Sequence, residues 1–289
     1  MIVITNNDGQ LCNQFILFAH CVATGMETGQ CVVNLAGRDI VKSATLEPQI
    51  LKRRGIWFFS WMTRWPLDKM WWKLTDWIQK AQGVKLKHYK RKTFAESKAY
   101  IEQCFPPHGG RRLFMINDWH FRNHGALARH HDEIVRLLSL KKEFYNKPVE
   151  IISGIRKAHP GIEIIGVHIR RGDYQTYSNG RWFYPDGVYA SLMREAAAAS
   201  PATPAFLICS DEPANLVFFK QCGMVVYAGP GHKIEDLAAL SLCDKIMGPP
   251  STYSWWAAFV SNIPLWHVWD ASQPAKSPNF IMLSPSDWP

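Results

Sequence analysis

A chain of 289 residues with 47% hydrophobic residues is long enough to bury the core of one large domain or two modest domains. Its formal net charge of +9 is local, because residues 52–92 hold twelve lysines and arginines against two acids and the remainder is close to neutral. No apolar run approaches the ~18 residues of a membrane-spanning helix. The first residues have the pattern of a strand and not that of a secretory leader, so we expect a cytoplasmic protein.

The first elements predicted are a strand over residues 2–6, a loop over residues 8–14, a helix over residues 15–27 and a strand over residues 30–35. This order is typical of the first unit of a doubly wound α/β domain. The loop has two interpretations from its residues alone. It either binds a ligand or is a plain turn in which Asn13 caps the helix.

Residues 51–92 carry the charge excess together with six of the thirteen tryptophans. Trp57, Trp61 and Trp65 recur at four-residue intervals, which predicts a helix that Pro66 ends, and residues 70–78 predict a second amphipathic helix. The rings either pack into the first domain, form a wall for an acceptor sugar, or lie in a membrane interface with the basic side chains toward headgroups. The charge indicates an anionic partner, and we expect a membrane surface or a lipid-linked phosphate and no nucleic acid.

Residues 113–117 predict a further strand, after which Asp118, Trp119 and His120 either line a cleft or are ordinary surface residues. Helices are predicted at about 132–139 and 147–159, and residues 130–132 are typical of a helix cap and solvated turn. We place the boundary at residue 150, which gives domains over residues 1–150 and 151–289. The histidines and cysteines show no metal-ligand spacing, and the seven cysteines, which form no C-x-x-C pair, are typical of buried thiols.

The central prediction concerns residues 161–174. Five residues in it are β-branched: Ile162, Ile164, Ile165, Val167 and Ile169. They predict a strand buried on both faces of a parallel sheet. Charged residues follow at its carboxyl end, where open α/β sheets bind ligands. Of Arg170 and Arg171, one should face the cleft and the other should be held by a carboxylate such as Asp173, and a guanidinium in a cleft suits a pyrophosphate.

Two later strands end in a similar way. Residues 205–209 are apolar and precede Ser210, Asp211 and Glu212, whereas residues 245–248 precede Ser251 and Thr252 at a predicted helix start. Free N–H groups at a helix start bind phosphate. The three strand ends therefore suit a nucleotide diphosphate, with its base on the carboxylates. Helices at 185–199, 216–222, 234–243 and 255–261 and strands at 225–227 and 265–268 complete a second doubly wound domain.

Four segments resemble the α-1,2-fucosyltransferase family and its α-1,6- and protein-O-fucosyltransferase relatives. His-Ile-Arg-Arg-Gly-Asp-Tyr at 168–174 is similar to the family signature, and residues 235–244 and 251–256 are similar to a second α-1,2 signature. Residues 9–14 resemble the family's glycine-rich loop, with Cys12 where glycine is usual. The likeness covers residues 8–29 and about 132–262, in the family's order and spacing.

The resemblance implies a GT-B fold, in which two Rossmann-like doubly wound domains face a cleft, a GDP-β-L-fucose donor, inversion at the anomeric carbon, and neither metal nor cofactor. It implies that Arg170 grips the pyrophosphate and that Asn13 lies near the reacting carbon. Further residues are implied at the nucleotide or its phosphates: Gln14, His168, Asp211, Ser251, Thr252 and Tyr253. For the proton of the acceptor, Asp8 and Asp173 are the candidate bases.

The resulting hypothesis is a bacterial fucosyltransferase that acts on a hydroxyl of a glycan, expected to be O2 of a galactoside. We expect this glycan to be built on the cytoplasmic face of the membrane. A lipid-linked acceptor and a peripheral contact of residues 51–92 with anionic lipid both fit the sequence. Two alternatives stay open. One is transfer of a different sugar or to a different hydroxyl, and the other is an inactive relative that binds glycans or membranes.

Overall fold

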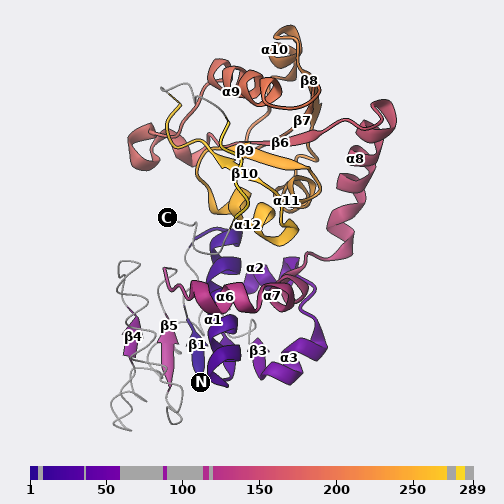
Figure 1. Ribbon diagram of the computed structural model, residues 1–289. Helices are drawn as coiled ribbons and strands as arrows, with labels where there is room; N and C mark the ends of the chain where they lie inside the picture. Colours follow the sequence, from indigo (N-terminus) through magenta and orange to yellow (C-terminus); the bar gives the residue numbers. More distant parts are fainter. Residues whose placement is uncertain are drawn as a thin grey trace. The chain divides into compact units, whose positions relative to one another are not determined.

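The structure is a computed structural model that describes residues 1–5, 9–35, 37–58, 87–89, 113–116, 120–271 and 278–283. The chain forms two compact units, Met1–Ser139 and Leu140–Pro289, and each contains a parallel five-stranded sheet with helices packed against it (Figure 1). The predicted α/β class with parallel sheets is confirmed. The units divide before Leu140 and not at 150, because α8 (Asn146–Ala158) belongs to the second unit, where Lys147 Nζ donates to Pro230 O at 2.6 Å.

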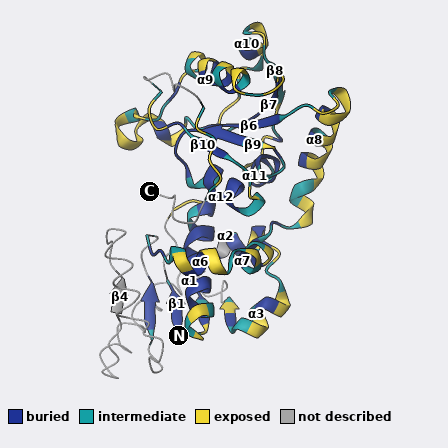
Figure 2. Cartoon of the chain, in the orientation of Figure 1, coloured by how far each residue is buried: buried dark blue, intermediate teal, exposed yellow. Residues whose placement is uncertain are grey.

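The sheet of the first unit has the strand order β3-β2-β1-β5-β4. Its strands are β1 (Ile2–Ile4), β2 (Val32–Asn34), β3 (Ile56–Phe58), β4 (Lys87–Tyr89) and β5 (Phe114–Ile116). The helices among the described residues of this unit are α1 (Leu11–Thr28), α2 (Arg38–Ser43), α3 (Pro48–Arg54), α6 (His124–Arg129) and α7 (His131–Leu138). β1 and β5 are buried along their whole length (Figure 2), as expected for central strands covered on both faces.

Helix α1 begins at Leu11, four residues before the predicted start. Gly9 turns the chain at φ +85° and Gln10 is extended, so the helix starts as soon as Leu11 and Cys12 can join Phe15 on its buried face. Asn13 is therefore a residue of the first helical turn and not its cap, which corrects the plain-turn interpretation. The predicted stop is confirmed, because Gly29 adopts the left-handed conformation at the carboxyl end.

The prediction of a helix through Trp57 is wrong. Gly55 ends α3 with φ +62°, and Ile56 then pairs with Val32 as the buried first residue of β3. Alternation along the strand turns Trp57 away from the core, and its side chain is 57% exposed. The four-residue spacing of Trp57, Trp61 and Trp65 therefore does not mark a helix at Trp57. The rest of the predicted helices, up to residue 78, lies outside the described residues.

The sheet of the second unit has the order β10-β9-β6-β7-β8. Its strands are β6 (Ile164–Ile169), β7 (Ala205–Ser210), β8 (Val225–Ala228), β9 (Lys245–Gly248) and β10 (Leu265–His267). Its helices besides α8 are α9 (Asp186–Ala198), α10 (Leu216–Gln221), α11 (Lys233–Ser241) and α12 (Thr252–Ser261), with short 3-10 turns η2 (Lys142–Tyr145), η3 (Asp173–Gln175) and η4 (Tyr177–Gly180). The predicted elements of residues 161–268 are confirmed to within a few residues.

The two faces of β6 carry different neighbours. Ile165, Val167 and Ile169 belong to the apolar cluster that α9 and α10 complete, and α11 and α12 pack on the opposite face (Figure 1). A Cβ on Gly166 would lie 2.7 Å from Leu240 Cδ2, so glycine at this position allows α11 to pack closely. His168 shares this second face and therefore points toward α12.

Two whole-chain expectations can be compared with the described residues. Within them no helix is both long and apolar enough to cross a bilayer. The six described cysteines form no disulfide with one another, and four of them, Cys12, Cys21, Cys209 and Cys243, are buried.

Candidate functional site

The carboxyl ends of β6, β7 and β9 lie at one edge of the second sheet, because all the strands are parallel. The structure brings together the polar residues that follow them. Arg170 Nη1 donates to Ser251 Oγ at 3.2 Å, and Asp211 Oδ1 accepts from the Arg171 N–H at 2.9 Å. The predicted convergence of three strand ends is therefore present.

Arg170 is held in a single orientation. Its Nε and Nη2 donate to the two carboxylate oxygens of Asp173 at 2.9 and 2.7 Å, and its Cζ lies 4.6 Å from the centroid of the Tyr174 ring. Burial opposes its charge, but the hydrogen bonds with Asp173 raise the pKa of Arg170 and lower that of Asp173. With the bond to Ser251, three of the five guanidinium donors have partners among the described residues. One N–H on each terminal nitrogen remains for a ligand.

Arg171 points to the other face of the sheet. It pairs with Asp186, in the first turn of α9, and donates from Nε to Tyr184 O at 3.4 Å. The expectation that Asp173 would hold the arginine facing away from the cleft is wrong. Both arginines are paired, and Asp173 holds Arg170, because alternation at the strand end carries Arg171 to the side of α9.

Asp211 closes the turn that follows β6. Its two carboxylate oxygens accept from the backbone N–H groups of Arg171 at 2.9 Å and Gly172 at 3.1 Å. A Cβ on Gly172 would lie 3.2 Å from Asp211 Oδ2, so the turn is fitted closely to this carboxylate. Asp211 therefore positions the segment that carries Arg170 and Asp173. Its predicted contact with a nucleotide stays a prediction.

The start of α12 has the features of an anion site. Ser251 is the N-cap, and its buried Oγ accepts from the Tyr253 N–H at 3.2 Å as well as from Arg170. The backbone N–H groups of Thr252 and Ser254 have no acceptor among the described residues. They point out of the positive end of the helix dipole, which attracts anions. The hydroxyl of Tyr253 donates to Lys233 O at 2.5 Å and so ties α12 to α11.

Two histidines, His168, which is buried, and His267, which is partly buried, lie behind this helix start. The ring of His168 lies 5.0 Å from that of Tyr253, and burial, with a smaller effect of Arg170, lowers its pKa to about 3. His267 Nε2 lies 3.1 Å from Ser254 Oγ, and burial lowers the pKa of His267 to about 4. Both imidazoles are therefore neutral at pH 7. His168 Nδ1 is buried and has no hydrogen-bond partner in the described part of the chain.

Asp236 is a further candidate site residue, which is not among those predicted from the sequence. It lies in the first turn of α11, which follows β8, and is 5% exposed. Its Oδ1 accepts from the Gly231 N–H at 2.9 Å, and burial raises its pKa to about 6. Asp236 lies in the segment 235–244, which resembles a family signature, and the acidic pair Glu235 and Asp236 after a strand is the sequence signal that points to it. A buried carboxylate with an elevated pKa beside strand ends is typical of functional sites.

Asn13 and Gln14 lie in the first unit, in the first turn of α1. Gln14 Nε2 donates to Gly9 O at 3.4 Å and to Asp39 Oδ2 at 3.3 Å. Asn13 Oδ1 and Gln14 Oε1 are buried with no hydrogen-bond partner among the described residues. An unsatisfied buried acceptor costs about 1–3 kcal/mol, so both oxygens favour a ligand that donates hydrogen bonds. Asp8, the other candidate base, lies outside the described residues, as do Asp118 and Trp119.

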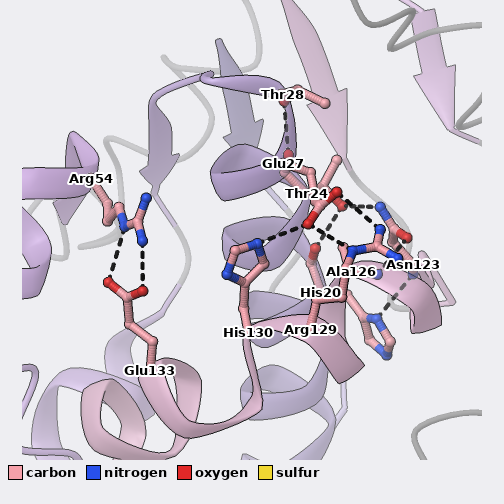
Figure 3. A network of polar contacts seen from close by, with 10 residues as sticks. All are labelled: His20, Thr24, Glu27, Thr28, Arg54, Asn123, Ala126, Arg129, His130 and Glu133. Atoms are coloured by element: carbon pink, nitrogen blue, oxygen red, sulfur yellow. Dashed lines mark hydrogen bonds and ion pairs between the residues drawn. The ribbon is translucent and has the colours of Figure 1, made fainter.

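Two histidines of the first unit, His20 and His130, have structural partners (Figure 3). The Asn123 N–H donates to His20 Nδ1 at 2.9 Å, and Glu27 accepts from Arg129 and contacts His130 Nε2, both at 2.9 Å. These bonds tie α1 to α6 and to the start of α7. His130 lies in the turn at the N-cap of α7, as predicted, whereas His131 and Asp132 already belong to the helix. The described residues contain no group of three or more His, Cys, Asp or Glu arranged to hold a metal ion.

The family model described as Glycosyl transferase family 11 matches residues 111–271. Galactoside alpha-(1,2)-fucosyltransferase 1 of Mus musculus is 28% identical over 150 residues, which cover 46% of this chain and 38% of that protein. Galactoside alpha-(1,2)-fucosyltransferase 2 of Oryctolagus cuniculus is 29% identical over 154 residues, which cover 50% and 41%. The chain thus spans less than half the length of these relatives.

Solved fucosyltransferase structures share the fold. NodZ from Bradyrhizobium superposes with a TM-score of 0.57 at 17% identity and covers 98% of each chain. POFUT1 in complex with GDP-fucose superposes with a TM-score of 0.53 at 10% identity over 96% of this chain and 95% of its own. The resemblance found in the sequence motifs is confirmed. The family model matches more than half of the residues of this chain. The chain therefore belongs to glycosyl transferase family 11, the α-1,2-fucosyltransferase family.

Proposed function

We propose that the protein transfers L-fucose from GDP-β-L-fucose to O2 of a galactoside in a glycan, with inversion and without a metal ion. The observation that carries the proposal is the Arg170 guanidinium, fixed by Asp173 and Ser251 at the start of α12. NodZ α-1,6-fucosyltransferase, whose fold is similar with a TM-score of 0.56, was soaked with GDP-fucose. This supports the same donor here.

The pyrophosphate binds the two remaining donors of Arg170 and the backbone N–H groups of Thr252 and Ser254. These groups are already oriented, since Asp173 holds the guanidinium from one side and Ser251 caps the helix. As fucose leaves, negative charge grows on the departing diphosphate while the sugar gains oxocarbenium character. Oriented donors stabilise that charge with little reorganisation, and one such donor is worth about 3–4 kcal/mol in the transition state.

The guanine base binds Asp236, and the contact of Asp211 with the nucleotide stays a prediction. Guanine presents two adjacent donors, N1–H and the N2 amino group, which a single carboxylate can accept together. Both oxygens of Asp211 already accept backbone N–H groups, whereas Asp236 accepts one, from Gly231. Burial also disfavours the ionised form of Asp236, so hydrogen bonds from a base would relieve that cost. His168, with its neutral ring beside Tyr253, is the second residue proposed at the nucleotide.

Proton removal from the acceptor is weakly assisted. Asp173 is a poor base, because the hydrogen bonds from Arg170 lower its pKa and occupy both oxygens. Departure of the diphosphate therefore provides most of the driving force. We further propose that the units form the two domains of a GT-B enzyme, with Asn13 and Gln14 of the first domain near the reacting carbon.

Incubation of the purified protein with GDP-fucose, lactose as a galactoside and excess chelator tests the proposal. We expect release of GDP and a product whose linkage analysis shows fucose on O2 of galactose. Transfer from another GDP-sugar, or to another hydroxyl, would support the alternative of different specificity. No transfer to any of a panel of terminal galactosides, together with no binding of GDP, would favour an inactive relative.

A further inference from the structure

The segment after β6 forms an exposed aromatic surface with the chain that follows β10. We call Tyr177, Trp182 and Trp269 the aromatic platform. The centroids of Tyr177 and Trp182 are 5.8 Å apart, as are those of Trp182 and Trp269, and Trp182 Nε1 donates to Trp269 O at 3.2 Å. Tyr177 is 53% and Trp269 40% exposed. In the described part of the chain, Trp57 is the one other aromatic side chain exposed to this degree, so exposed rings gather at this place.

The platform is attached to the residues proposed to hold the pyrophosphate. Tyr174 stacks on Tyr177 with centroids 5.5 Å apart and an interplanar angle of 22°, and the same ring contacts the guanidinium of Arg170. The Tyr174 hydroxyl donates to Pro250 O, one residue before Ser251. A single buried ring therefore separates the platform from the group that holds the leaving diphosphate, and that ring is anchored to the start of α12.

The backbone beside Tyr177 is strained. Ser178, Asn179 and Gly180 have φ angles of +50°, +57° and +72° in succession. For a residue other than glycine this left-handed conformation costs roughly 1–2 kcal/mol. Such strain persists where the surrounding structure holds it, and it collects at binding sites. Here it places an exposed ring against Trp182 and surrounds it with exposed polar side chains: Gln175, Thr176, Ser178 and Asn179.

A pyranose ring matches this surface. One side of many pyranoses presents C–H groups, which pack on aromatic rings, and the rim carries hydroxyls, which suit amide and hydroxyl partners. A protein partner would require a specific interface of about 800 Å² on each side, far more than three rings supply. We propose that the aromatic platform is the subsite for a pyranose of the acceptor glycan, an inference that rests on the proposed function.

The test measures steady-state transfer from GDP-fucose to lactose by Tyr177→Ala and Trp269→Ala, whose exposed side chains can be removed without opening the core. Each variant should raise KM for lactose about tenfold, the usual effect of losing one stacked ring. The KM for GDP-fucose and the thermal shift produced by GDP should not change. Tyr177→Phe, which keeps the ring, should stay near wild type, as should Val217→Ala, which removes an exposed apolar side chain on α10.

An unchanged KM for lactose in both alanine variants overturns the inference, and so does a raised KM for GDP-fucose alone, which would assign the platform to the donor. If the wild-type protein transfers no fucose, the proposed function fails and the platform is tested separately by saturation-transfer NMR with lactose and with methyl glycosides of glucose and N-acetylglucosamine. Binding that Tyr177→Ala abolishes supports the platform. Absence of binding to all three probes overturns it.

Discussion

Replacement of Arg170 by alanine should remove most of the transfer activity and leave the protein folded. Two N–H donors of Arg170 are available to the diphosphate, and loss of one oriented donor from a transition state typically reduces the rate by about 10²–10³. We therefore expect kcat to fall by at least that factor. Arg170→Lys should also be poor, because one ammonium cannot hold Asp173 and span two phosphate oxygens together.

The effect on folding should be small. Asp173 is 51% exposed, so water can solvate its carboxylate once Arg170 is absent, and partly exposed ion pairs contribute about 1 kcal/mol or less. Ser251 keeps its hydrogen bond from the Tyr253 N–H and continues to cap α12. The melting temperature should therefore fall by only a few degrees.

Arg171→Ala is the matched control. Asp186 is 24% exposed, against 51% for Asp173, whereas the two arginines are similarly buried. The pair of Arg171 and Asp186 links the end of β6 to α9 on the opposite face of the sheet. We expect this variant to lose more stability than Arg170→Ala and to keep activity within a few-fold of wild type per folded molecule. Turnover near the wild-type rate in a folded Arg170→Ala protein would refute the proposed pyrophosphate site.

Three further predictions concern the nucleotide, Asp236 and the basic segment. GDP should raise the melting temperature more than GMP does, with or without chelator, because GMP lacks the second phosphate for Arg170; equal shifts in a thermal melt would contradict the site. Because burial raises the folded-state pKa of Asp236 to about 6 while the unfolded value stays near 3.8, its ionisation destabilises the fold as pH rises from about 4 to 6. Over that range, the free energy of unfolding of Asp236→Asn, measured with urea, should rise relative to that of the wild type by up to about 3 kcal/mol. A difference in unfolding free energy that does not change with pH would contradict the assigned burial. Residues 51–92 should bind anionic vesicles at low salt, with a binding free energy of about 1 kcal/mol for each basic residue near the lipid. A membrane contact would be contradicted if the protein does not co-sediment with the vesicles, or if it still does so after the lysines and arginines of 52–92 are neutralised.

The sequence by itself determined the second sheet and the edge at which its polar residues meet. The β-branched residues of 161–169 indicate a strand buried on both faces, and apolar runs at 205–209 and 245–248 indicate two more. Parallel strands carry their carboxyl ends to one edge, so the sequence alone places Arg170, Asp211 and Ser251 together. These are local signals, since each depends on residues within one strand and the turn after it.

The tertiary structure alone decided which groups pair at that edge. Asp186, the partner of Arg171, comes from the following helix, and the Asp211 carboxylate is occupied by the turn after β6. Burial of Asp236, and with it the elevated pKa, results from packing of α11 in the second unit. Trp57 shows the same limit, because pairing of Ile56 with Val32 prevailed over a helical spacing of tryptophans. Pairing, burial and sheet registry join residues far apart in the chain, and periodicity within a short segment carries no information about them.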